Sequence, residues 1–322
     1  MKSWTATGIG LAVRDISVLV DDYPHADEKV KATQMYESCG GPVPTALVTL
    51  ARFGRTTALA SYVGNDDVGR FILKSLNGEG VQTEAVKIKK KRQSATSVII
   101  VENGRRTILE PPDTQSFSLN WQDVRQLPLK QCRSLLVDAR CIEIQIKAAK
   151  IVRQAGGLVV LDCGHPRKGV ELLLEHTDIA IFSHTYATAL FGENYDTKLF
   201  LSNIFKKLPQ DGPAICGLTL GEQGCALFSK QEPFFTLKPK KVKAVDSTGA
   251  GDVFHGAFIH AYLKTMSVQR AARFANISAA YKCEGLSGTA SIPDEELIWS
   301  EVKSFKLSTT ATGIVSLESQ LS

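Results

Sequence analysis

Residues 243–265 read KAVDSTGAGDVFHGAFIHAYLKT, and this stretch decides the fold. The alternation at 242–245 predicts a short strand, and the triplet Gly249-Ala250-Gly251 then precedes apolar residues at helical spacing. Glycines let the chain turn tightly before a helix and leave its first N–H groups unobstructed, while the aligned peptide dipoles attract anions. The stretch therefore predicts a strand, a phosphate-binding turn and an amphipathic helix.

Asp252 falls in the first turn of that helix. A carboxylate beside a phosphate cradle is a poor phosphate ligand, because the two negative charges repel. It suits a general base that takes the proton from a hydroxyl group attacking the phosphorus. A first-turn acid also stabilises a helix through the helix dipole alone, and this alternative applies to any single Asp. The complete order of strand, D-S-T-G-A-G-D and helix favours the catalytic role.

The stretch resembles the C-terminal signature of the ribokinase-like (phosphofructokinase-B) carbohydrate kinases, whose pattern is close to D-T-x-G-A-G-D. The resemblance implies that Gly249, Ala250 and Gly251 form an anion hole for the transferred phosphoryl group, with Thr248 beside the nucleotide and Asp252 as the base. It also implies an α/β, ribokinase-like three-layer fold with a mostly parallel central sheet and a small β-sheet lid. ATP and Mg²⁺ are then the expected cofactors.

Length and composition narrow the classes of protein to which the chain could belong. The 322 residues, 43% of them hydrophobic, fit one large domain or one domain with a small appendage. Together with the resemblance, this predicts a single kinase domain over 1–306 and a disordered tail at 307–322. The net charge of +5 is mild and no aromatic residues interleave with the lysine clusters, so we expect no nucleic-acid binding. Seven scattered cysteines without C-x-x-C spacing argue against disulfides and structural zinc. With no apolar run long enough for a signal peptide or a membrane span, we expect a cytoplasmic protein.

Apolar residues at 8–13 predict a first strand, with Asp15 where it ends. Polar side chains at the C-terminal ends of strands in α/β sheets point into the ligand crevice. Asp15 fits a turn equally well, but the matching Asp of the family holds sugar hydroxyl groups. We therefore assign Asp15 to the substrate.

Two segments, 16–39 and 94–110, alternate apolar and polar residues, and Asn103-Gly104 is a strong hairpin signal. They predict a small separate sheet, one face of which needs cover. In the family this sheet is the lid, and it often joins two subunits, so we expect a homodimer. Asp27 lies in it, either reaching the sugar or exposed without a ligand.

Gly40, Gly41 and Thr45 occupy the positions of the family's N-terminal signature, G-G-x-x-x-N-x-A. Paired glycines permit close approach of the backbone to a ligand. The resemblance assigns these three residues to the sugar. Thr45 replaces the usual sugar-binding Asn, which reduces the hydrogen-bonding atoms available to the substrate.

Strand 56–64 and a capped helix over 66–78 follow, and from Ser134 short apolar strands alternate with helices. This pattern predicts a parallel sheet covered on both faces, with ligands at the C-terminal ends of the strands. Arg140, after one such strand, either contacts substrate or lies on the surface. Asp162 and His165, after the next, have structural and site roles equally open to them.

Ser183 and Tyr186 fall where many family members carry N-x-x-E, a motif associated with magnesium and phosphate. The ketohexokinase and sulfofructose-kinase branch also lacks that motif and is the nearest in pattern. Magnesium is then held mainly through nucleotide oxygens and water.

The nucleotide side follows from two weaker patterns. Four residues carry the predicted nucleotide contacts: Thr219, Gly221 and Gly224 in a T-x-G-x-x-G turn, and Asn276 on a helix of small residues. The loop 285–293 resembles the segment whose carbonyl groups, together with Asp246, hold a monovalent cation such as K⁺ in many relatives.

These observations indicate an ATP-dependent sugar kinase acting on a primary hydroxyl group. Glu110, in the lid, disfavours an anionic group on the substrate, so we expect a neutral ketose or related polyol. The altered Thr45, Ser183 and Tyr186 leave open a non-catalytic sugar- or nucleotide-sensing protein on the same fold. A dinucleotide-dependent oxidoreductase requires G-x-G-x-x-G after an early strand, and the sequence has none.

Overall fold

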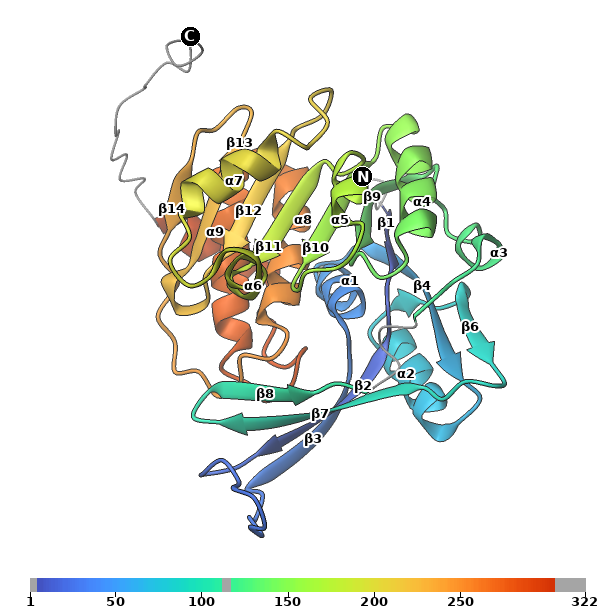
Figure 1. The fold of residues 1–322 in the computed structure, drawn as a ribbon, viewed down its shortest axis with the longest axis vertical. Coiled ribbons are helices and arrows are strands. Elements are labelled where there is room, and N and C mark those ends of the chain that lie inside the picture. The colour runs from blue at the N-terminus through green and yellow to red at the C-terminus, as the bar shows by residue number, and fades with distance from the viewer. Residues whose placement is uncertain (1–4, 112–116, 305–322) are drawn as a thin grey trace.

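Two β-sheets organise the part of the chain that the computed structural model describes, residues 5–111 and 117–304 (Figure 1). The predicted tail at 307–322 lies outside these residues. The strands of the large sheet are β1 (Thr5–Ile9), β4 (Thr56–Gly64), β5 (Val81–Gln82), β6 (Val86–Lys89), β9 (Cys132–Val137), β10 (Leu158–Cys163), β11 (Ile179–Ser183), β12 (Ile215–Thr219), β13 (Cys225–Ser229) and β14 (Phe235–Leu237).

The strand order is β14-β13-β12-β11-β10-β9-β1-β4-β5, and β6 also pairs with β4. Every pair from β12 to β5 is parallel, whereas β13 and β14 add to one edge in antiparallel fashion. Parallel neighbours bring the carboxyl ends of β1, β9, β10, β11 and β12 to one edge of the sheet. The predicted mostly parallel sheet is confirmed.

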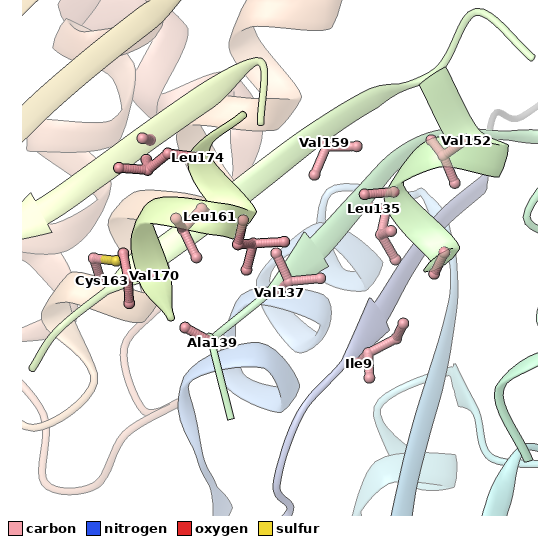
Figure 2. Close-up of a cluster of buried hydrophobic side chains, with 14 of the residues drawn as sticks. Ile9, Leu135, Val137, Ala139, Val152, Val159, Leu161, Cys163, Val170 and Leu174 are labelled. Carbon is pink, nitrogen blue, oxygen red and sulfur yellow. The ribbon is translucent and has the colours of Figure 1, made fainter. Parts of the chain in front are cut away.

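Helices cover both faces of this sheet. One face carries α1 (Pro42–Arg52), α2 (Asp67–Gly78), α8 (Ala250–Thr265), α9 (Val268–Lys282) and α10 (Glu295–Ser304). The other carries α3 (Trp121–Val124), α4 (Ile142–Gln154), α5 (Val170–Leu174), α6 (His184–Phe191) and α7 (Thr197–Phe205). Figure 2 shows the second face, where side chains of β9 and β10 meet those of α4 and α5. Full burial of each large aliphatic side chain stabilises the fold by about 1.5–3 kcal/mol.

The small sheet is the predicted lid. Its four strands, β2 (Val13–Leu19), β3 (Gln34–Gly40), β7 (Ala95–Glu102) and β8 (Arg105–Leu109), run in the order β3-β2-β7-β8. The turn between β7 and β8 has positive φ at both Asn103 and Gly104, as the sequence predicted. In Figure 1 the small sheet extends below the large one, and an isolated bridge between Gly104 and Asp246 joins it to the segment that precedes α8.

Two strand predictions are wrong. The first strand ends at Ile9 rather than at residue 13, and Asp15 lies inside β2, because Val13–Leu19 pairs with β3 and β7 in the lid. Residues 242–245 form no strand: the N–H groups of Val245 and Asp246 donate to Cys283 O instead of to a neighbouring strand. The helix after the glycine triplet is confirmed as α8.

Candidate active site

The glycine triplet begins α8 in the way an anion-binding turn requires. Gly249 caps the helix with φ of 74°, and a Cβ atom there would lie 2.5 Å from the Gly288 carbonyl oxygen, so a side chain fits neither the backbone nor the space. At Gly251, no other atom lies within 4 Å of the position that a Cβ atom would take. The first N–H groups of an α-helix have no partner within the helix. In this structure the Ala250 N–H group donates to Ser247 O over 3.3 Å, which closes the turn at the start of α8.

Asp246 holds the turn before α8 in place through hydrogen bonds. Its fully buried carboxylate accepts hydrogen bonds from Thr248 N at 2.8 Å and from Ser287 N at 2.9 Å. These two bonds fix the chain on either side of the cradle, which explains why an acid precedes the glycines. The buried Thr248 hydroxyl group has no hydrogen-bond partner among the described residues, and a bound ligand at the cradle would supply one.

Asp252 lies in the first turn of α8, partly buried, at the head of the cradle. Burial raises the pKa of Asp252 to about 7, and the Asp162 carboxylate adds to the rise, while His255, Arg106 and Lys282 oppose it. A carboxylate with a pKa near the working pH is well matched to general base catalysis.

Asp162, at the end of β10, is tied to the same helix. Its Oδ2 lies 3.4 Å from Nδ1 of His255, and that nitrogen is also 2.8 Å from Gly251 O. Burial raises the pKa of Asp162. Of the two residues that the sequence left open, Asp162 belongs to this site, whereas His165 is exposed after the strand.

The predicted substrate side converges on the same place. Asp15 is 8% exposed, and a Cβ atom on Gly40 would lie 1.8 Å from its Oδ2, so the lid carboxylate occupies the space that the glycine leaves. Burial raises the pKa of Asp15 to about 7, with further contributions from Asp252, Asp246 and Glu110. Asp15 and Asp252, 237 residues apart in the chain, thus interact electrostatically.

The remaining residues of the N-terminal signature lie on the same side. Gly41 has φ of 101° and a Cβ atom there would lie 2.2 Å from Leu11 O, so the chain approaches itself closely at this point. Thr45 is buried in α1, where its Oγ1 faces Gly288 in the loop behind the cradle. The helices meet where Gly256 of α8 leaves room for the Ala46 carbonyl group of α1. The two signatures are thus brought together by helix packing.

Two predicted substrate residues have other surroundings. Asp27 is exposed in the loop between β2 and β3. The side chain of Arg140 is 6% exposed and pairs with Asp138 at 3.3 Å, so the alternative of a surface arginine is wrong. Asp138 also accepts a hydrogen bond from Gln145 at 3.1 Å, a contact that no local sequence pattern predicts.

The predicted nucleotide-side residues lie at the end of β12, in the turn after it and on α9. Thr219 ends β12 and donates to Phe182 O at 3.3 Å, while Gly221 and Gly224, with φ of 56° and 91°, shape the turn that follows. Asn276 is buried on α9 and donates to Lys238 O at 3.3 Å. The nucleotide contacts of the turn residues stay predictions, and the Asn276 amide nitrogen is engaged by the protein itself.

Sequence reasoning missed three cationic side chains around the cradle. Arg106 of β8 donates to Ser247 Oγ at 2.9 Å, Lys282 of α9 donates to Asp246 O at 2.7 Å, and Arg52 of α1 donates to Thr289 O at 2.7 Å. Only Arg106 lies close to a feature that the sequence predicts, because it follows the Asn103-Gly104 turn by two residues. The other two contacts depend on the packing of distant helices.

Magnesium fits this site through oxygen ligands. The described residues contain no group of three or more His, Cys, Asp or Glu side chains that could hold a metal ion. The carboxylate of Asp162 would supply a hard oxygen atom of the kind that Mg²⁺ prefers, and this ion commonly completes its shell with nucleotide phosphates and water, which leaves Asp252 available as the base. Across the described ranges, no helix has the length and apolar character needed to cross a bilayer.

Comparison with known proteins agrees with this geometry. The family model "pfkB family carbohydrate kinase" matches residues 6–295. A sugar kinase of Archaeoglobus fulgidus, described as uncharacterized, is 31% identical over 244 residues, which cover 73% of this chain and 93% of that protein. Mouse ribokinase is 26% identical over 88% of this chain and 90% of its own length.

Solved structures share the fold. A putative ribokinase from Agrobacterium tumefaciens superposes with a TM-score of 0.82 at 26% identity, covering 94% of this chain and 98% of that one. Ribokinase from Arabidopsis thaliana superposes with a TM-score of 0.76 at 24% identity, covering 94% and 99%. With the cradle and the acid at its head in place, the chain belongs to the pfkB family of ATP-dependent carbohydrate kinases.

Proposed function

We propose that the protein transfers the γ-phosphoryl group of ATP to a primary hydroxyl group of a neutral sugar, a ketose or a related polyol. The observation that carries this proposal is that the lid, which holds Asp15, is joined to the cradle by the bond from Arg106 to Ser247 Oγ and the bridge between Gly104 and Asp246, close enough for the charge of Asp252 to act on Asp15. A ligand between lid and cradle would contact both. A sugar bridging them has one hydroxyl group at the base and others at Asp15.

Asp252 takes the proton of the attacking hydroxyl group as its oxygen forms the new bond to phosphorus. The bond between that phosphorus and the bridging oxygen of ATP breaks, and ADP leaves with the electron pair. The N–H groups of Gly249, Ala250 and Gly251 stabilise the charge on the transferring oxygens. Magnesium, when bound, neutralises phosphate charge. Thr219, Gly221, Gly224 and Thr248 hold the nucleotide.

The carboxylates of Asp15 and Glu110 favour a neutral substrate. Glu110 adds to the negative potential at Asp15, so a phosphate or sulfonate on the sugar meets repulsion there. Positive charge is also near, since Arg167 interacts with Arg140 and Glu110. Sugar acids therefore belong in any test. The lack of N-x-x-E fits the ketohexokinase and sulfofructose-kinase branch, while the named relatives include ribokinases and deoxyribokinases.

A coupled assay of ADP release tests the proposal. The panel holds ketoses, ribose, deoxyribose, nucleosides, sugar acids and sugar phosphates, each with the wild type and with Asp252→Asn. We expect Asp252-dependent turnover that is fastest with a neutral ketose or polyol. Turnover confined to ribose or to a sugar acid contradicts the substrate class. A thermal shift with some sugar but no ADP release with any contradicts catalysis and supports the sensing alternative.

The lid also supports a homodimer. Four apolar side chains of β3 and β8 are exposed: Met35, Tyr36, Ile108 and Leu109. Exposed apolar patches on sheets are common at subunit interfaces. Light scattering of the wild type and of Ile108→Glu measures the mass, and a wild-type monomer contradicts the dimer. All seven cysteines are free, which fits the reducing cytoplasm we propose as its location.

A further inference from the structure

Lys282 is a fully buried lysine directly behind the cradle. It is the last residue of α9, it is 0% exposed, and its Nζ donates to Asp246 O over 2.7 Å. Lysine is almost never fully buried unless it is paired, because removal of an ammonium group from water is costly. Burial lowers the pKa of Lys282, while the Asp246 carboxylate opposes that change. Such a placement requires a compensating role.

The surroundings of Lys282 identify that role. The segment that begins at Asp246 and the loop 285–291 meet around it: Asp246 Oδ2 accepts from Ser287 N, and Gly249 packs against Gly288. The backbone at Ser287 has φ of 99°, a conformation that residues with a side chain rarely adopt, so the loop is strained at this point. The ammonium group thus lies where the segment that begins at Asp246 meets the loop 285–291, and these two segments support the cradle.

A monovalent cation is expected at this place from the family resemblance, held by Asp246 and the carbonyl groups of the loop. The residues present do not fit it. The Asp246 carbonyl oxygen already accepts from the Lys282 ammonium group. A second unit charge about 4 Å from the first, at a dielectric constant of about 20, weakens ion binding by roughly a thousandfold.

We propose that the Lys282 ammonium group takes the place of the monovalent cation, so that the enzyme works without potassium. The inference rests on the proposed kinase function. Lys282 is a positioning residue: it fixes the Asp246 carbonyl group and, through it, the turn that presents the anion-hole donors. A cation attached to the chain is always present, whereas a free ion must be bound from solution.

Two measurements on the wild type test this proposal first. Melting temperature with and without ATP, and ADP release with the best sugar, are compared in potassium and in tetramethylammonium buffers of equal ionic strength. We expect no difference between the two buffers in either measurement. A wild-type enzyme whose melting temperature or turnover rises in potassium overturns the proposal.

Variants then separate charge from packing. Lys282→Ala removes the ammonium group and opens space, so we expect turnover to fall by about 10–100-fold, the usual effect of losing a group that orients a site from behind. Potassium should restore part of that turnover and raise the melting temperature of this variant. Lys282→Met keeps most of the volume without the charge, so it should lose turnover without recovery. Lys264→Ala, on the exposed side of α8, is the matched control and should show no potassium dependence.

The outcomes are distinct from those of the substrate assay. If no sugar is phosphorylated, the proposed function fails, yet the melting temperatures still report on Lys282. If both Lys282 variants match the wild type in turnover and melting, the positioning role is refuted. If neither variant folds, the wild-type comparison between the two buffers decides.

Discussion

The guanidinium group of Arg106 donates a hydrogen bond to Ser247 Oγ over 2.9 Å, joining the lid to the loop that forms the phosphate cradle. The two residues are 141 positions apart in the chain. Their contact accompanies a bridge between Gly104, at the hairpin turn, and Asp246, which begins the cradle motif. A lid strand therefore supplies a positive charge directly at the place where the γ-phosphate is expected.

Arg106→Ala should lower kcat/KM by roughly 10²-fold, as expected when one donor to a developing negative charge is lost. Steady-state kinetics at saturating ATP measures the change. Arg105→Ala is the matched control, since Arg105 is the exposed neighbour on the same strand and should change little. If Ser247→Ala reproduces the whole loss, Arg106 acts by docking the lid and does not contact phosphate.

Asp252→Asn should lower turnover by about 10²–10⁴-fold, the range for loss of a general base, while nucleotide affinity stays nearly the same. Turnover is followed by ADP release and affinity by calorimetry. Asp67→Asn provides the comparison, because Asp67 is also a first-turn acid but lies exposed on α2. Near-normal turnover of Asp252→Asn would mean that another group accepts the proton.

Local sequence patterns predict most of the fold and part of the candidate site. The glycine triplet, the Asn103-Gly104 turn and the βα alternation after Ser134 each act over a few residues, so the sequence predicts them. The prediction that Asp15 follows the first strand is wrong, because β2 pairs with β7 of the lid, a strand that lies far away in the sequence. Lys282 ends an ordinary small-residue helix, and only the packing of α9 against the cradle reveals its contact with Asp246.

Asp15→Ala should lower kcat/KM for the sugar by about 10–100-fold, because a buried carboxylate that accepts hydroxyl hydrogen bonds contributes charged hydrogen bonds. ATP affinity should not change, since Asp15 is a lid residue on the sugar side. The same kinetics on Asp27→Ala decides its open role. We expect a much smaller effect, because Asp27 is exposed in the loop at the end of the lid. An equal loss in both variants would place Asp27 on the sugar.

The pH profile of kcat/KM should show an ascending limb near pH 7. Burial, followed by the charge of Asp162, raises the pKa of Asp252 to about 7, so the carboxyl group is protonated below that pH and cannot accept the substrate proton. Activity therefore falls as pH decreases through about 7 and is level above it. Asp162→Asn removes one of the negative charges that favour protonation, and the limb should move to lower pH.

The control for that shift is Asp211→Asn, an exposed acid at the opposite end of the parallel strands that pairs with Arg153. It should leave the limb in place, since it does not contact the cleft. Because Asp15 also titrates near this range, the limb must be measured at saturating as well as at low sugar. A limb that stays fixed in Asp162→Asn under both conditions would show that Asp252 does not govern the profile.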